Sequence, residues 1–228
     1  IIEGEAVTRD FRLSAKPRSH VVLSIRSNQP RRLHISSDRL IFTSTNWNID
    51  QTVTFTAIDD NIDNDDANTT ITIAVTSSDS RYNGTLDDSF YFRVIDNDNA
   101  GIIYDSSSII LSEGQSIIRS FKLQSQPTSN VILNISSNDT NSRLSISKSS
   151  LVFTESNWNI EQSVVFTAID NNIKDDDADV LVTIKSSSTD LSYNNLTSVF
   201  MITVKDNDVD NKLGTLMFTT STFAVDYA

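Results

Sequence analysis

Apolar and polar side chains alternate along most of the chain, which is the pattern of β-strands that bury one face. In residues 52–57, Val53, Phe55 and Ala57 point one way and the threonines between them point the other way. The same period of two recurs in residues 70–75, and no window carries the spacing of an amphipathic helix. Because Thr, Val, Ile and Phe also favour strands, the sequence predicts an all-β protein.

The pattern occurs twice along the chain. Residues 40–62 align with residues 151–173, and 16 of these 23 positions are identical. The match extends upstream to a shared Glu-Gly pair and downstream to a shared Asp-Asn-Asp. Such self-similarity indicates tandem domains. We expect a first repeat with a truncated first strand at residues 1–99, a second repeat at residues 100–210, and the first strand of a third at residues 211–228.

Each repeat offers about seven short strands separated by turn signals, which is typical of an antiparallel Ig-like β-sandwich. A chain of 228 residues is long enough for each half to bury a core of its own. The sequence therefore predicts tandem Ig-like antiparallel β-sandwiches, and a closed barrel is the alternative.

Each repeat also contains a strand that runs into a dense group of acids, at residues 55–67 and 166–178. Calcium takes six to eight oxygen ligands, and in a sandwich this loop, the opening segment and the end of the last strand can meet at one pole. The first unit would contribute Glu3, Asp59, Asp60, Asp63, either Asp65 or Asp66, Asp96 and Asp98. The second would contribute Glu113, Asp170, Asp175, either Asp176 or Asp177, Asp206 and Asp208.

Two substitutions distinguish the second acidic group from the first. Asn171 stands where the first unit has Asp60, and Lys174 stands where it has Asp63. We therefore expect the second calcium site to be weaker or to hold fewer ions. The alternative for both groups is a solvated acidic turn, because Asp and Asn are common turn residues.

The combination of these features resembles the Calx-beta family. The resemblance rests on the Glu-Gly pair, the closing Asp-x-Asp and the segment LxFTxxNWNxxQxVxFTAxDxN, and it covers both full units. It implies Ig-like sandwiches with calcium at the acids named above. The Ala-x-x-Gly-x-Asp-Tyr stretch of the family is missing, and residues 31–39 and 143–150 stand in its place. The resemblance therefore implies no calcium ligand at residues 31–39 or 143–150.

The charge and composition narrow the choice of partners. A net charge of −12 repels nucleic acids and anionic membranes, and it favours cations. The absence of cysteine excludes disulfides and thiolate chemistry. No apolar run approaches the about 20 residues of a membrane helix, and the sequence contains no signal-peptide pattern.

Several other residues are candidates for a function. Trp47 and Trp158 could stack on sugars, but a Trp between two Asn just before a strand more often packs under a loop, and we expect the same packing for Tyr82 and Tyr193. The sequons number no more than chance would give, and the candidate N-glycosylation sites are Asn68, Asn83, Asn134, Asn138 and Asn195.

The sequence does not predict an enzyme. His20 and His34 are the only histidines, and Asn130 and Ser145 stand at the matching positions of the second unit. The five glycines form no phosphate-binding loop. Paired acids could serve as a glycosidase pair, but a site that recurs at a repeat junction favours a structural role.

The function predicted from these features is a structural one. We expect an extracellular, cell-surface segment that forms a calcium-rigidified stalk, filament or adhesin shaft. Its partners would be the neighbouring repeats of its own chain and copies of itself in a filament. One alternative is a module that binds a glycan or a surface protein, and another is a calcium-sensing regulatory domain.

Overall fold

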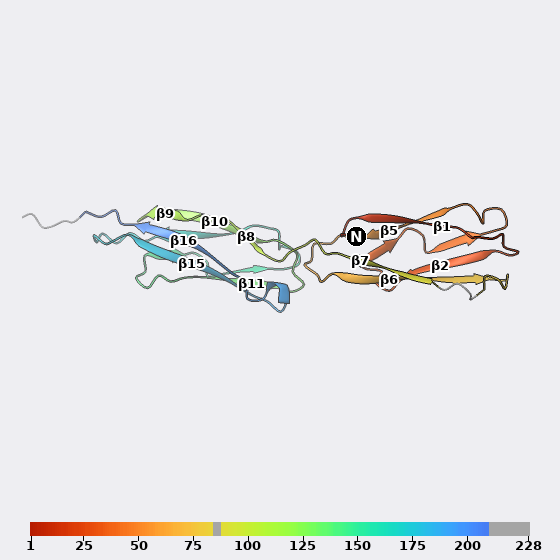
Figure 1. The fold of residues 1–228 in the computed structure, drawn as a ribbon. Helices are drawn as coiled ribbons and strands as arrows, with labels where there is room; N and C mark the ends of the chain where they lie inside the picture. The colour runs from red at the N-terminus through yellow and green to blue at the C-terminus, as the bar shows by residue number, and fades with distance from the viewer. Residues whose placement is uncertain (84–87, 210–228) are drawn as a thin grey trace, which may run out of the picture. The chain divides into compact units, whose positions relative to one another are not determined.

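The computed structural model describes residues 1–83 and 88–209, and these residues form two compact units. The first unit is built on Ile1–Gly101 and the second on most of the described residues from Ile102 onward (Figure 1). Within the described ranges the chain is all-β, apart from one 3-10 turn, η1 (Leu191–Tyr193), and no helix there could cross a bilayer. The strand expected at residues 211–228 lies outside the described residues.

The first unit is a sandwich of two antiparallel sheets. One sheet has the order β4-β2-β6-β7 and the other has the order β1-β5-β3. The seven strands are β1 (Ala6–Phe11), β2 (Val21–Ser27), β3 (Leu33–Ile35), β4 (Arg39–Phe42), β5 (Gln51–Ala57), β6 (Ala67–Ser77) and β7 (Asp88–Val94).

The second unit repeats this plan and adds two short strands at its start. Its sheets have the orders β13-β11-β15-β16-β9 and β12-β14-β10-β8, and β9 runs parallel to β16. The strands are β8 (Ile102–Tyr104), β9 (Ile109–Ser112), β10 (Ser116–Leu123), β11 (Val131–Ser137), β12 (Leu144–Ile146), β13 (Ser150–Phe153), β14 (Gln162–Ala168), β15 (Ala178–Ser187) and β16 (Thr197–Lys205).

The core of each unit follows from the alternation in the sequence. Val53, Phe55 and Ala57 are buried along β5, while the residues between them are partly or fully exposed. The ring of Phe55 lies 5.6 Å from that of Phe90 and 5.3 Å from that of Phe92, measured between centroids. The predicted all-β class and the predicted inward positions of this strand are therefore confirmed.

We expect the substitution Tyr82→Phe to lower the free energy of unfolding by about 1 kcal/mol. The side chain is buried, with 7% of its surface exposed, and its hydroxyl donates a 2.6 Å hydrogen bond to the carbonyl of Ala15. Tyr91→Phe is the matched control, because 71% of Tyr91 is exposed. Urea unfolding of both variants measures the difference, and equal stabilities would show that the Ala15 contact contributes nothing.

Candidate metal centre

A tight turn before β1 fixes the position of Glu3. Gly4 has a φ of 81°, which a residue with a side chain rarely adopts. The amide of Glu3 donates to the carbonyl of Ile95 at 3.0 Å, and the amide of Gly4 donates to the carbonyl of Ala57 at 3.1 Å. The turn therefore holds Glu3 between the ends of β5 and β7, where the acids of the first unit lie.

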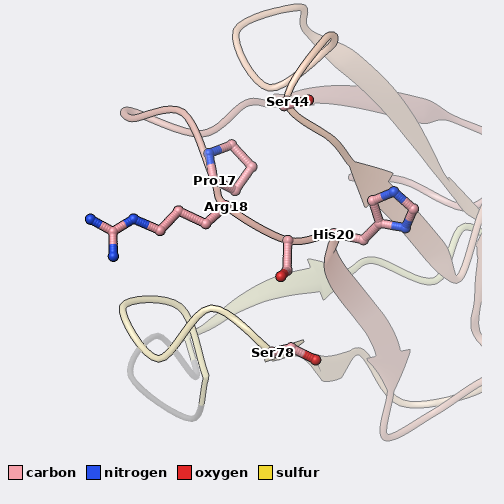
Figure 2. Close-up of a pocket in the computed structure, with 6 residues that line it drawn as sticks. Pro17, Arg18, His20, Ser44 and Ser78 are labelled. Carbon is pink, nitrogen blue, oxygen red and sulfur yellow. The ribbon is translucent and has the colours of Figure 1, made fainter.

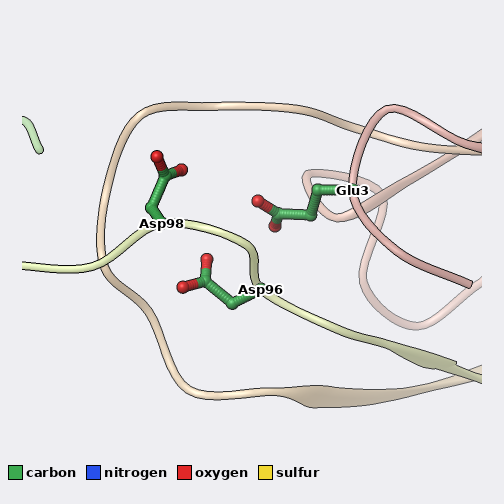
Figure 3. A group of neighbouring side chains, drawn as sticks. All are labelled: Glu3, Asp96 and Asp98. Atoms are coloured by element: carbon green, nitrogen blue, oxygen red, sulfur yellow. The ribbon is translucent and has the colours of Figure 1, made fainter.

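Three carboxylates converge at this pole of the first unit. Glu3, Asp96 and Asp98 each offer an oxygen, and these oxygens lie within 4.8 Å of one another. Figure 3 shows Glu3 facing the two aspartates, which follow β7, while the loop between β5 and β6 passes around all three. Segments that are more than ninety residues apart in sequence thus meet at one point.

Each of these carboxylates has at least one buried oxygen to which no described residue donates a hydrogen bond, although Oδ2 of Asp96 accepts a 3.2 Å bond from the amide of Asn64. Glu3 is only 3% exposed. Among the described residues, neither of its oxygens has a hydrogen-bond partner, nor does Oδ1 of Asp96 or Oδ2 of Asp98. Arg32 Nη1 lies 3.2 Å from Glu3 Oε1, which is an ion-pair distance without the alignment of a hydrogen bond. Because buried acceptors are rarely left unpaired, this arrangement points to a ligand with positive charge.

The electrostatics of the cluster agree with its geometry. Burial raises the pKa of Glu3 to about 7, with the charges of Asp60, Asp96 and Asp98 adding to the effect and Arg32 opposing it. Burial also raises the pKa of Asp96 and of Asp98, and neighbouring aspartates add to both shifts. In the metal-free chain Arg32 offsets only part of the negative charge of the three carboxylates, and their oxygens fit a hard cation such as calcium.

Two further acids of the first unit lie beside this cluster and shape its loop. Oδ1 of Asp60 accepts a 2.8 Å hydrogen bond from the amide of Ile62. Oδ2 of Asp63 accepts a 2.9 Å bond from the amide of Ala100. Each of these carboxylates has a second oxygen, so both residues remain candidates for a ligand role.

The other predicted acids of the first unit are exposed. Asp66 accepts from the amide of Asp96 at 3.1 Å and pairs with Arg93 at 2.9 Å. The backbone bond and the Arg93 side chain lower the pKa of Asp66. Asp65 is exposed and presents its carbonyl to Arg32 at 2.8 Å, and Asp59 is exposed beside Gly4.

The second unit has the same kind of cluster with different members. Glu113, Asp170 and Asp208 offer oxygens within 4.8 Å of one another. Gly114 repeats the turn with a φ of 78°, and its amide donates to the carbonyl of Ala168 at 2.9 Å. Glu113 is 4% exposed, and among the described residues its Oε2 has no hydrogen-bond partner. Burial raises the pKa of Glu113, and nearby aspartates add to the shift.

Lys174 is the main difference between the two clusters. Its ammonium donates a 2.5 Å hydrogen bond to Oδ2 of Asp206, whose side chain is 1% exposed. This bond lowers the pKa of Asp206, whereas the pKa of the matching Asp96 is raised. A side-chain cation therefore already neutralises one acid of the second unit.

The remaining predicted acids of the second unit are held by local contacts. Asp175 pairs with Arg143 at 3.2 Å and accepts from Nδ2 of Asn171 at 3.1 Å. Oδ1 of Asp177 accepts from the amide of Asp206 at 3.0 Å. Asp176 is exposed and presents its carbonyl to Arg143.

Two arginines that the sequence did not indicate as site residues contact the clusters. Arg32 contacts Glu3 in the first unit, and Arg143 contacts Asp175 in the second. Both occupy the stretch where the Calx-beta pattern is missing. The signal in the sequence was an Arg-Leu pair that opens the third strand of one unit and its counterpart, β12, in the other.

The Asn-Trp-Asn motifs lie in loops that are tied to the strands. Trp47 is partly buried against the core, and its carbonyl accepts from the amide of Leu13 at 2.8 Å. Oδ1 of Asn46 accepts from the amide of Thr43 at 2.6 Å, and Asn157 makes the same bond to Thr154. These contacts favour loop packing over an open platform for sugars.

The candidate glycosylation sites are accessible. All five asparagine side chains belong to exposed residues, which are Asn68, Asn83, Asn134, Asn138 and Asn195. Oδ1 of Asn138 accepts from the amide of Leu181 at 2.8 Å, so a sugar on this residue would change a contact that positions the strand.

A cavity of the first unit lies at the other end of its strands, beside the segment between β1 and β2. It measures about 430 Å³ and is lined by Pro17, Arg18, Ser19, His20, Ser44 and Ser78. In Figure 2 the Arg18 side chain points away from the other lining residues. The cavity is open and lacks converging charged groups, so the acidic cluster is the better candidate site.

No protein-family model and no curated protein matches this chain. Solved structures with similarity include CBD12 from CALX1.2, at 12% identity and a TM-score of 0.42, covering 89% of this chain and 95% of that one. The calcium binding domain CBD12 of CALX1.1 is similar at 13% sequence identity and a TM-score of 0.41, and the match covers 81% of this chain and 76% of that one. The periplasmic chaperone SfaE is similar at 11% sequence identity and a TM-score of 0.39, and the match covers 48% of this chain and 59% of the chaperone. The case for a cation at the acidic cluster therefore rests on the chain's own residues.

Proposed function

We propose that the chain is a non-catalytic structural segment whose sandwiches bind calcium at their acidic poles. The observation that carries the proposal is the set of buried carboxylate oxygens in the first unit, at Glu3, Asp96 and Asp98, which converge without hydrogen-bond donors. Its recurrence in the second unit, at Glu113, Asp170 and Asp208, supports the same role there.

Calcium would supply positive charge and take several oxygens at once. Glu3 belongs to the segment that opens the first unit, while Asp96 and Asp98 belong to the segment that closes it. Asp60 and Asp63 lie on the loop between β5 and β6, which passes around these three residues. Ligands from three segments would therefore be tied together, and the repulsion among their charges would be removed.

The wider proposal is a calcium-rigidified stalk, filament or adhesin shaft on the cell surface. The internal repeat supports this wider proposal. Some ligands of each ion site belong to the segment that closes a unit, so bound calcium would stiffen the chain where one unit joins the next. The opening strand of a third repeat at residues 211–228 belongs to this proposal. The exposed sequon asparagines are compatible with glycosylation.

Calcium titration of the whole chain by isothermal calorimetry tests the proposal. We expect saturable binding at both units, and we expect Glu3→Gln to weaken the site of the first unit by about tenfold or more, because one anionic ligand is lost. Asp88→Asn is the matched control, since Asp88 is exposed at the opposite end of β7. A wild-type chain that takes up no calcium at millimolar concentration would refute the proposal.

A further inference from the structure

Arg32 holds the acidic loop of the first unit at both ends. Its carbonyl accepts a 3.0 Å hydrogen bond from the amide of Ile58, where the loop leaves β5. Its guanidinium donates through Nη2 to the carbonyl of Asp65 at 2.8 Å, just before the loop enters β6. One residue thus brackets the segment that carries Asp60 and Asp63.

The same bracket recurs in the second unit around Arg143, which matches Arg32 in the internal repeat. The carbonyl of Arg143 accepts from the amide of Ile169 at 2.8 Å, and its guanidinium donates to the carbonyl of Asp176. These two partners match those of Arg32 in the repeat. Only 15% of the Arg32 side chain and 13% of the Arg143 side chain are exposed. Because an arginine is rarely covered to this extent without partners, the bracket is a regular feature of both units.

In the first unit the guanidinium also contacts the acidic cluster itself. Nη1 of Arg32 lies 3.2 Å from Oε1 of Glu3, one of the oxygens to which no described residue donates a hydrogen bond. Within the described part of the chain, no other basic side chain forms an ion pair with Glu3, Asp96 or Asp98. The charge of Arg32 also opposes the rise in the pKa of Asp96. Arg32 is therefore the counter-charge of the cluster in the metal-free chain.

A metal ion at the cluster would meet this guanidinium at Glu3. Calcium binds carboxylate oxygens at about 2.3 to 2.6 Å, so an ion on Oε1 of Glu3 would stand close to Nη1 of Arg32. Positive charges that are this close repel each other, most strongly where water is partly excluded. Calcium binding therefore requires the guanidinium to withdraw from Glu3.

We propose that Arg32 is an internal competitor of calcium, which occupies Glu3 in the metal-free chain and sets the affinity of the first site. This inference rests on the proposed function, because it concerns the same cluster. The bond to Asp65 keeps the acidic loop in place in the absence of metal, and the contact with Glu3 offsets part of the negative charge. Removing the arginine charge therefore strengthens calcium binding, whereas removing a residue that only ordered the loop would weaken it.

Calcium titration by calorimetry of the variant Arg32→Gln tests this inference. Every chain carries Glu113→Gln, so that the heat reports the first site, and the chain with this change alone is the parent. We expect Arg32→Gln to raise the affinity about tenfold, because a positive charge beside the ion is lost. Arg32→Lys keeps the charge, so its affinity should stay within about threefold of the parent. Arg31→Gln is the matched control, since it makes the same change of charge at an exposed neighbour.

A second measurement needs no calcium. In chelator, Arg32→Gln should lower the melting temperature by roughly 5 °C, because Glu3 loses its counter-charge and the carbonyl of Asp65 loses a donor. This loss should be smaller in a chain that also carries Glu3→Gln, since the charge that Arg32 offsets is then absent. An equal loss in both backgrounds would show that the contact between Arg32 and Glu3 has no effect, and it would overturn the inference.

The outcomes of the titration separate this inference from the proposed function. A parent chain that takes up no calcium at millimolar concentration refutes the proposed function of the first site, and the inference falls with it. If the parent binds calcium and Arg32→Gln binds it no more tightly, the proposed function stands and Arg32 is not a competitor. An Arg32→Lys chain with the affinity of Arg32→Gln also overturns the inference, because the charge would then have no effect.

Discussion

Adding calcium to the metal-free chain is expected to raise the free energy of unfolding by about 2.7 kcal/mol when free calcium is 100-fold above its dissociation constant. For sandwiches of this size the melting temperature would rise by roughly 10–20 °C. The reason is that Glu3, Asp96 and Asp98 keep buried oxygens without donors in the metal-free chain. Scanning calorimetry in calcium and in chelator measures the difference, and magnesium at equal concentration is the control for ionic strength.

A double variant, Glu3→Gln with Glu113→Gln, separates a site effect from a general salt effect. The rise in melting temperature on adding calcium should largely disappear, because each cluster loses its buried glutamate. In chelator the double variant should melt above the wild type, since a neutral amide replaces a buried charge. If the double variant responds to calcium as the wild type does, the ion acts elsewhere on the chain.

The same cluster gives the metal-free chain a defined dependence on pH. The carboxyl of Glu3 has a pKa of about 7 in the folded chain and of 4.5 in the unfolded chain. Between these two pH values, Glu3 is therefore protonated in the folded chain and ionised in the unfolded chain. Stability therefore falls as the pH rises from 4.5 to 7, by on the order of 3 kcal/mol for this group. Calcium binds the ionised form, so its affinity should rise between pH 6 and pH 8. Calorimetry in buffers of different ionisation enthalpy would detect the released proton, and identical heats would contradict the prediction.

The second large effect is expected from placing a lysine in the first unit where the second unit has one. Asp63→Lys should weaken calcium binding at the first site by about a hundredfold or more, because a carboxylate is lost and a positive charge is added within a few ångströms of the ion. The model for this variant is Lys174, whose ammonium neutralises Asp206 at 2.5 Å. The reverse substitution, Lys174→Asp, should strengthen calcium binding at the second site.

Two controls assign the cause of these changes. Asp63→Asn removes the carboxylate without adding charge, so its effect should be smaller than that of Asp63→Lys. Lys148→Asp makes the same charge change as Lys174→Asp at an exposed residue of the second unit, and it should leave the affinity unchanged. A Lys174→Asp chain that binds calcium no better than the wild type would show that the lysine does not limit the second site.

Most of the fold could be predicted because its signals are local. The alternation around Phe55 and Phe166 is set by the geometry of single strands, and both residues are fully buried. The edge strands could not be predicted in the same way. Arg9 and Arg119 match in the sequence, but Arg9 is exposed, whereas Arg119 is buried beside β8, which pairs with the outer edge of β10.

The candidate site was predictable as a region, while its members were not. Neighbouring acids in a loop can face the cluster or the solvent, and the direction of each side chain depends on the backbone conformation of the folded loop. Asp66 turns outward to Arg93, whereas Asp98 faces Glu3. The approach of Arg32 to Glu3 depends on a tertiary contact between residues far apart in sequence, for which the local pattern carries no signal.

The parallel pairing of β9 with β16 determines how the second unit responds to tension along the chain. The chain enters this sandwich along β8 and β9 and leaves it along β16, so a pull on the two ends draws β9 and β16 in opposite directions. The bonds that join Ile109–Ser112 to Ile202–Lys205 run across the direction of pull and are loaded together in shear, so they do not open one at a time as a peeled hairpin does. The sandwich is thus connected so that β9 and β16 resist extension jointly.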